Sequence, residues 1–277
     1  MYTLNCKGKL LTLAKPIVMG IINATPDSFY DQYPQKGFDA IIALADKMMG
    51  EGAGILDIGG QSTRPESVRI SADQEMARVL PVIELLSEKY PDSILSIDTY
   101  YSKVAAAAVK AGASIVNDVS AGSMDAAMLQ TVAALQVPYI CMHIKGTPQT
   151  MQQNASYNDV VKEVLDFFIQ KIADCTKAGI QDIIIDPGFG FAKTIQHNFI
   201  LLKNLGVFQM LDKPILAGLS RKSTVYKTLN ATAAEALNGT TVLNTLALMN
   251  GAAIVRVHDV REARETILLV EKYKEAI

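Results

Sequence analysis

The chain of 277 residues contains no tryptophan, three cysteines, three histidines and no long uninterrupted apolar run. Cys6, Cys141 and Cys175 lie too far apart for a structural metal site or a disulfide framework, a pattern typical of a reducing compartment. The apolar tracts are shorter than the roughly 20 residues that span a bilayer. Residues 1–15 contain no stretch of signal-peptide length. We therefore expect a cytoplasmic protein without a membrane partner.

The chain also lacks an excess of charge of either sign. Its 26 Lys and Arg residues nearly balance 28 Asp and Glu residues, which gives a net charge of −2. Such a chain has no overall field that favours nucleic acid or an anionic membrane. We expect no nucleic-acid partner, and any anion must be bound by a local cluster of positive groups.

What the sequence does contain is a series of eight short apolar segments, each ending in polar, acidic or glycine residues. They are Ile17–Ile22, Ile55–Ile58, Ile94–Ile97, Ser114–Val116, Val137–Met142, Ile183–Ile185, Pro214–Ala217 and Ala252–Val257. Helical patterns separate most of them, and no linker divides the chain. Eight strand–helix units in about 250 residues predict an α/β fold, a (β/α)8 TIM barrel forming one domain over residues 1–277. Two short segments around Asn5–Gly8 predict an additional N-terminal β-hairpin.

Three polar residues follow different predicted strands, and in a barrel the carboxyl ends of the strands meet at one rim. Asp98, Asn117 and Asp186 occupy these positions. Carboxylate and carboxamide groups suit a flat heterocycle that presents N–H donors and ring acceptors. The alternative is that each Asp caps the following helix. The three residues together favour a ligand site.

The segment Asp186–Phe191 (DPGFGF) adds to this site. Its glycines allow the backbone to approach a ligand closely, and Phe191 could stack on a ring. Met142, at the end of the fifth strand, could line the same slot. The alternatives are a tight turn that needs glycine only for its dihedral angles, and a Met that belongs to the core.

A local anion site is expected where Gly218–Ser223 (GLSRKS) ends the seventh strand and opens a helix. Hydroxyl, guanidinium and ammonium groups gather there, although Lys222 could instead form a Schiff base. In the eighth segment, Arg256 and His258 share one face because side chains alternate along a strand. With Asn23 and Arg64 they could hold a pyrophosphate, and Mg²⁺ could bridge its oxygens to the side chain of Asn23.

Seven motifs run in the same order as in a known family: Met19–Phe29, Asp57–Pro65, Ser96–Thr99, Ile115–Asp118, Ile185–Gly190, Ser220–Ser223 and Arg256–His258. Over nearly the whole chain the sequence resembles the dihydropteroate synthases, the folate-pathway enzymes that sulfonamides inhibit. The resemblance implies that 6-hydroxymethyl-7,8-dihydropterin pyrophosphate condenses with p-aminobenzoate, giving 7,8-dihydropteroate and pyrophosphate, with Mg²⁺ as cofactor. It also implies a homodimer.

The resemblance assigns roles to residues of this chain. The pterin would be bound by Asp98, Asn117, Met142, Asp186, Phe191, Lys222 and Arg256. The pyrophosphate would be bound by Asn23, Thr63, Arg64, Arg256 and His258, with Asn23 as the metal ligand. The p-aminobenzoate pocket would be formed by Phe29, Asp31, Thr63, Arg64, Pro65, Lys222 and Ser223. Catalysis would depend on Asp98, Lys222 and Arg256.

Two other functions share part of this pattern. A barrel that transfers a methyl group from methyltetrahydrofolate to a corrinoid protein would also need Asp98, Asn117 and Asp186. It would not need the Ser220–Ser223 turn or the predicted anion cluster. A non-catalytic pterin binder would be expected to lack some of the charged rim residues, and this chain has all of them. The synthase is therefore the favoured interpretation.

Overall fold

The computed structural model describes residues 1–24, 34–62 and 68–276. Its centre is a sheet of eight parallel strands in the order β8-β7-β6-β5-β4-β3-β10-β9. A parallel bridge between Ile185 and Ile215 joins the two outer strands, so the sheet closes. The strands are β3 (Ile17–Asn23), β4 (Ile55–Gly59), β5 (Leu95–Asp98), β6 (Ile115–Asp118), β7 (Tyr139–Met142), β8 (Ile183–Asp186), β9 (Leu216–Ala217) and β10 (Ile254–Val257). The predicted (β/α)8 barrel is confirmed.

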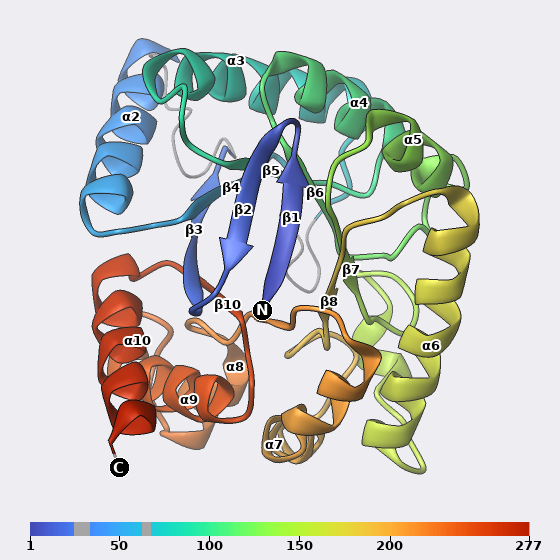
Figure 1. Cartoon of the computed structure of the whole chain (residues 1–277), viewed down its shortest axis with the longest axis vertical. Helices are drawn as coiled ribbons and strands as arrows, with labels where there is room; N and C mark the ends of the chain where they lie inside the picture. The colour runs from blue at the N-terminus through green and yellow to red at the C-terminus, as the bar shows by residue number, and fades with distance from the viewer. Residues whose placement is uncertain (25–33, 63–67, 277) are drawn as a thin grey trace.

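Helices surround this barrel (Figure 1). They are α2 (Pro34–Gly50), α3 (Ala72–Lys89), α4 (Ser102–Ala111), α5 (Met128–Leu135), α6 (Val160–Ala178), α7 (Ile195–Lys203), α8 (Ser223–Thr228), α9 (Leu237–Met249) and α10 (Val260–Glu275), with 3₁₀ turns η1 (Met151–Asn154) and η2 (Leu205–Leu211). Ser71 begins α3 with a capping box to Gln74, which satisfies two N–H groups at the helix start. Among the described residues, no helix has both the length and the apolarity needed to cross a membrane.

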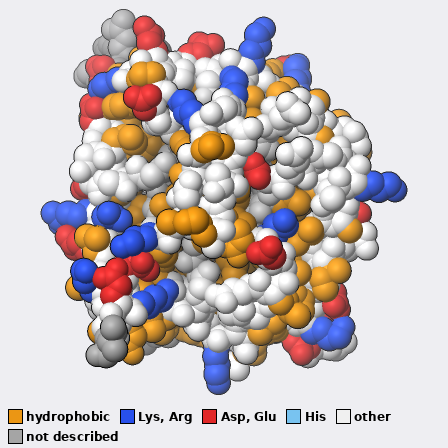
Figure 2. Space-filling model, in the orientation of Figure 1, with side chains coloured by type: hydrophobic (Ala, Val, Ile, Leu, Met, Phe, Trp, Pro, Cys, Tyr) orange, Lys and Arg blue, Asp and Glu red, His pale blue; other side chains and the backbone are white. Residues whose placement is uncertain are grey.

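The amino-terminal end of the barrel is covered by the predicted hairpin. Strands β1 (Tyr2–Cys6) and β2 (Lys9–Leu13) pair antiparallel, and they cross the barrel in Figure 1. Their buried side chains pack against the first apolar residues of the barrel strands in one cluster: Leu4, Cys6, Leu13, Met19, Ile55, Ile94, Ile115, Ile140, Ile184, Leu216 and Ile254. On this face charged side chains of both signs are interspersed (Figure 2). The hairpin leaves the carboxyl ends of the strands as the end available for a site.

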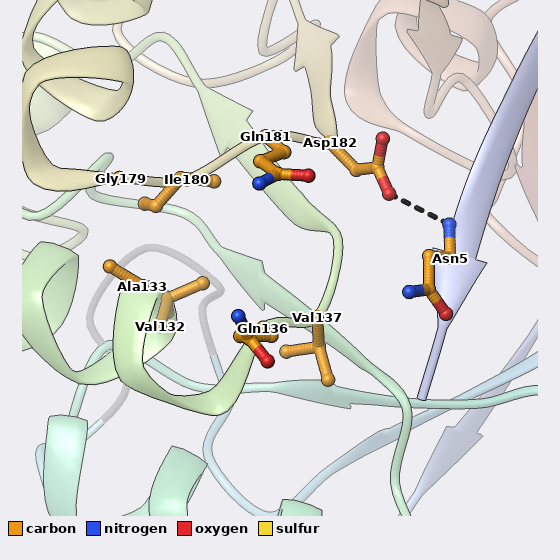
Figure 3. Close-up of a pocket in the computed structure, with 9 residues that line it drawn as sticks. All are labelled: Asn5, Val132, Ala133, Gln136, Val137, Gly179, Ile180, Gln181 and Asp182. Carbon is orange, nitrogen blue, oxygen red and sulfur yellow. Dashed lines mark hydrogen bonds between the residues drawn. The ribbon is translucent and has the colours of Figure 1, made fainter. Parts of the chain in front are cut away.

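A cavity of about 100 Å³ lies beside the hairpin, at the end opposite to that rim (Figure 3). It is lined by Asn5, Val132, Ala133, Gln136, Val137, Gly179, Ile180, Gln181 and Asp182. The backbone N–H of Asn5 donates to Asp182 Oδ2 at 2.7 Å, which fastens the hairpin to the start of β8. The cavity contains none of the predicted site residues.

Candidate active site

The predicted residues at the carboxyl ends of neighbouring strands lie in one row. The strand register places Asn23 beside Gly59, Gly59 beside Asp98, and Asp98 beside Asn117. On the next pair of strands, Met142 lies beside Asp186. Parallel pairing therefore brings residues from distant segments to the same rim, as the sequence predicts.

Arg256 is the centre of the first cluster of charges at this rim. Its Nε donates to Asp57 Oδ2 at 2.6 Å, and its Nη2 donates to Asp98 Oδ2 at 2.7 Å. The side chain of Asp98 is 11 % exposed and that of Asp57 is fully buried. Asp98 therefore binds Arg256 rather than capping a helix, which removes the capping alternative for this residue.

Asp57 is a site residue that the sequence analysis missed, because it lies inside an apolar strand segment. Its Oδ2 also accepts a hydrogen bond from Asn117 Nδ2 at 3.1 Å, and its Oδ1 has no hydrogen-bond partner among the described residues. An ionised carboxylate can only accept, so the amide nitrogen of Asn117 must face Asp57. The amide oxygen of Asn117 is then the atom available to accept a hydrogen bond from a ligand. An acidic residue within a predicted buried strand was the signal, since buried charges need partners.

The charge state of Asp98 depends on two opposing effects. Burial raises the pKa of Asp98 to about 7, with Asp57 as a further raising influence, and Arg256 acts in the opposite direction. The same two carboxylates raise the pKa of Arg256 despite its own burial, so the guanidinium stays charged. Arg256 thus stays charged between Asp57 and Asp98, and Asp98 is the carboxyl group whose pKa lies near neutral pH.

Asp186 and Lys222 form a second cluster around Gly218. A Cβ atom at Gly218 would lie 3.6 Å from Lys222 Nζ and 4.0 Å from Asp186 Oδ2, so both side chains converge there. Burial lowers the pKa of Lys222 to about 8, and Asp186 opposes this shift. Burial raises the pKa of Asp186, and Lys222 opposes that shift. The Schiff-base alternative requires a lysine without an anionic partner, and the proximity of Asp186 to Lys222 weighs against it.

Phe191 and Met142 provide apolar surface beside this cluster. Lys222 Nζ lies 4.6 Å from the centroid of the Phe191 ring and donates to the carbonyl of Phe189. Met142 is buried in a group that also includes Phe191 and Ala192. Asp186 Oδ1 accepts from the N–H of Gly188 at 2.7 Å, so Asp186 shapes the turn as well as facing Lys222. The turn and the ligand interpretations of this segment are therefore compatible.

His258 and Ser220 meet at the ends of β10 and β9. The Ser220 hydroxyl accepts from the backbone N–H of His258 at 3.2 Å and lies 3.0 Å from His258 Nδ1. His258 is exposed, and Ser223 is the first residue of α8. The positions after the seventh and eighth strands are where barrels often bind phosphate.

Arg221 does not belong to the predicted anion site. It adopts a left-handed conformation with φ of 54°, and its Nη2 donates to Asp259 Oδ1 at 2.8 Å. It also donates to the carbonyl oxygens of Ala233 and Ala234, just before α9. The expectation that this guanidinium binds an anion is wrong, because its hydrogen bonds link the end of β9 to Asp259 and to the residues before α9.

Five predicted residues lie outside the described part of the chain: Phe29, Asp31, Thr63, Arg64 and Pro65. Their assignment to the pyrophosphate and p-aminobenzoate sites stays a prediction. The next described residues are held by Gln61, whose Nε2 donates to the carbonyl of Val68 at 3.1 Å and whose Oε1 accepts from the N–H of Ile70 at 2.9 Å. The amide of Gln61 thus closes the long connection after β4.

Glu75 of α3 is a buried acid behind the Asp98 cluster. Thr99 Oγ1 donates to Glu75 Oε2 at 2.9 Å, and Glu75 Oε1 has no partner among the described residues. Burial raises the pKa of Glu75 from 4.5 to about 8, and the Thr99 hydrogen bond acts in the opposite direction. Between these two pH values the folded chain binds a proton that the unfolded chain does not.

We therefore expect stability to fall as pH rises from about 4.5 to 8, and Glu75→Gln to remove this fall. The free energy of unfolding of the variant should exceed that of the parent by roughly 2–4 kcal/mol at pH 8, with a smaller gain at pH 5.5. Urea denaturation at the two pH values measures both quantities. Parallel pH profiles for the two proteins would contradict this account of Glu75.

Comparisons with known proteins agree with this geometry. A model of the pterin binding enzyme family matches residues 19–258. This chain belongs to that family. The dihydropteroate synthase of Escherichia coli (strain K12) is 40 % identical over 267 residues, covering 96 % of this chain and 94 % of the relative.

Solved structures of pterin binding enzymes give the same result. Yersinia pestis dihydropteroate synthase with a sulfonamide drug complex aligns with a TM-score of 0.93 at 38 % identity, covering 99 % of this chain and 100 % of that chain. Xanthomonas albilineans dihydropteroate synthase in complex with 7,8-dihydropteroate has a TM-score of 0.90 at 36 % identity and covers 100 % of both chains. The predicted family and enzyme class are confirmed.

Proposed function

We propose that this rim performs the dihydropteroate synthase reaction with the residue roles given below. The 6-hydroxymethyl-7,8-dihydropterin pyrophosphate loses pyrophosphate while its methylene carbon bonds to the amine of p-aminobenzoate, which releases a proton. The observation that carries the proposal is the Arg256 cluster, where one partly buried guanidinium binds Asp57 and Asp98 beside Asn117. This cluster combines acceptors for a heterocycle with a cation for the pyrophosphate.

The pterin ring is recognised by acceptors from three strands. Asp186 accepts from ring N–H and amino groups, as ionised carboxylates do well, and the Asn117 oxygen accepts from a further donor. Phe191 and Met142 cover the faces of the ring. The ammonium of Lys222, held between Asp186 and Phe191, donates to a ring acceptor.

Charge stabilisation accounts for catalysis in this proposal. If the leaving group departs early, positive charge spreads over the pterin, and the buried Asp98 carboxylate stabilises it. Arg256, Arg64 and His258 neutralise the charge that grows on pyrophosphate. Fixed charges directed at developing charge are usually the largest catalytic contribution.

The amine of p-aminobenzoate is already a nucleophile, so no strong base is needed. In this proposal the carboxylate of p-aminobenzoate, or the sulfonyl group of a sulfonamide, binds near Ser223 and Lys222.

The side chain of Asn23 fits a Mg²⁺ ion that is held mainly by the substrate. The described residues contain no group of three or more His, Cys, Asp or Glu side chains that could hold a metal alone. Mg²⁺ is usually bound by substrate phosphates and one or two protein oxygens, and Asn23 at the end of β3 offers one. When bound, the ion would neutralise pyrophosphate charge.

Pyrophosphate release tests the function. It is measured with both substrates, with each alone, and with EDTA added. Release that requires both substrates and decreases with EDTA supports the proposal. Tight pterin binding without release would indicate a non-catalytic binder, and methyl transfer from methyltetrahydrofolate would indicate the corrinoid-dependent class.

We also propose that the chain forms a homodimer through α9. This helix contains no charged residue, and Val242, Leu246 and Met249 lie exposed on one of its faces while other residues face the core. Exposed apolar side chains that cluster on one face often mark an interface. Ile195 and Phe199 of α7, which packs against α9, are also exposed. A second copy of the chain is the partner that covers this surface.

We also propose a cytoplasmic location, which the three free cysteines fit because they form no disulfide.

Leu246→Glu is expected to convert the dimer into a monomer, because it places a charge in an apolar interface. Light scattering coupled to size-exclusion chromatography measures the mass. Ile169→Glu is the control, since Ile169 is a similarly exposed residue on α6. A monomeric parent, or a Leu246→Glu variant that remains dimeric, would contradict the proposed interface.

A further inference from the structure

Lys193 is a buried lysine just beyond the Asp186–Phe191 turn, and the proposed reaction does not use it. Its side chain is 4 % exposed. Its ammonium lies 3.1 Å from the carbonyl oxygen of Gly188, 3.0 Å from that of Phe191 and 2.9 Å from His143 Nδ1. The carbonyl oxygen of His143, 3.4 Å away, is a fourth acceptor, so every hydrogen of this group has a partner. Burial lowers the pKa of Lys193 well below its usual value, and Asp186 acts in the opposite direction. Burial of a lysine is costly, which makes this arrangement unusual unless it stabilises a needed conformation.

His143 at the end of β7 is a neutral acceptor for this ammonium. Burial lowers the pKa of His143 to about 2, and Lys193 is the next largest cause. The imidazole is therefore uncharged, and its Nδ1 shares a hydrogen bond with Lys193. The edge-on Phe167 ring, 4.8 Å away between centroids, holds the imidazole in place. Lys193 thus links the β8 turn to the end of the neighbouring strand.

The turn that Lys193 holds contains one strained residue. Gly188, Gly190 and Ala192 all have positive φ, at 69°, 82° and 50°, and only Ala192 has a side chain that disfavours this conformation. A Cβ at Gly188 would lie only 2.1 Å from the carbonyl oxygen of His143, so the turn is pressed against the end of β7. Unusual backbone conformations of this kind persist only where the surrounding structure enforces them. Tyr157 also contacts this turn, since its hydroxyl donates a hydrogen bond to the carbonyl of Ala192 at 2.9 Å.

We propose that Lys193 is a positioning residue for the pterin, holding the Gly188–Ala192 turn against His143 so that Asp186 and Phe191 keep the spacing the ring requires. The inference rests on the proposed function, because those two residues are its pterin contacts. The link is direct. Lys193 binds the carbonyl of Phe191, and Gly188, which it also binds, donates its N–H to Asp186. Without Lys193, three carbonyl groups and one imidazole lose their common partner, and the turn is free to relax.

The first test replaces Lys193 with Met, which keeps the length of the side chain and removes the donor. We expect the KM for dihydropterin pyrophosphate to rise by about 100-fold while the KM for p-aminobenzoate stays within about twofold, since small misplacements of a binding group have effects of this size. Lys162→Met is the control. Lys162 is exposed on α6 and forms an ion pair with Asp166, away from the turn. A variant that only loses stability would show unchanged KM values, and that result would overturn the proposal.

A second pair of variants keeps the test valid if Lys193→Met does not fold. His143→Asn retains an acceptor near the position of Nδ1, whereas His143→Leu removes it. A higher pterin KM in His143→Leu than in His143→Asn supports the proposal, and equal values contradict it. If the parent releases no pyrophosphate, the proposed reaction fails by itself. The same variants are then compared by calorimetry with a pterin, where an unchanged dissociation constant would overturn the role of Lys193 separately.

Discussion

Arg256→Ala is expected to reduce kcat by on the order of 10³-fold, because it removes the cation that binds both Asp57 and Asp98. Steady-state measurement of pyrophosphate release determines the loss. Arg256→Lys should recover only part of the rate, since a lysine cannot bridge two carboxylates with a rigid fork. An unchanged rate in Arg256→Ala would exclude this residue from the site.

The same substitution should also lower stability, in a pH-dependent way. Removal of one partner from a buried ion pair typically costs about 3–5 kcal/mol. Arg256 is the main influence that lowers the pKa of Asp98, so its loss lets that pKa rise above its value of about 7. The protonated acid is then favoured in the folded chain. Stability should therefore be nearer to that of the parent at pH 6 and fall further behind at pH 8. Equal losses at both pH values would contradict the assigned pairing.

Asp186→Asn is expected to weaken binding of a pterin by about 2–5 kcal/mol, roughly 30- to 5,000-fold in the dissociation constant. Asn retains an oxygen that can accept from the N–H of Gly188, so the turn survives while the charge facing Lys222 is lost. Isothermal calorimetry with the pterin substrate or its analogue measures the change.

Asp182→Asn is the matched control for this experiment. Asp182 lies four residues earlier, beside the hairpin at the opposite end of the barrel, where it accepts from Asn5. This variant should bind the pterin normally. Near-normal affinity in Asp186→Asn, or an equal loss in both variants, would remove Asp186 from the pterin site.

The sequence predicts the barrel because local patterns determine it. Each strand is a short apolar run, and the polar residue that ends it reaches the rim through parallel pairing. The strand register confirms that Asp98 and Asn117 lie side by side at this rim, while their role in pterin binding stays a prediction.

The errors concern partners that are distant in the sequence. Asp57 and Arg256 are separated by 199 residues, so nothing near either residue reveals their ion pair. Arg221 was misplaced because its left-handed backbone turns the side chain toward Asp259, away from the neighbouring Ser220 and Lys222. The role of Lys193 is hidden for the same reason, since its partner His143 follows β7 and lies 50 residues earlier in the sequence.

A crystal structure of the chain with a dihydropterin pyrophosphate analogue tests the central claim most directly. The proposal predicts the ring between Asn117 and Asp186, and the diphosphate beside Arg256 and His258. An analogue bound at the hairpin end of the barrel, or a diphosphate directed away from His258, would contradict it.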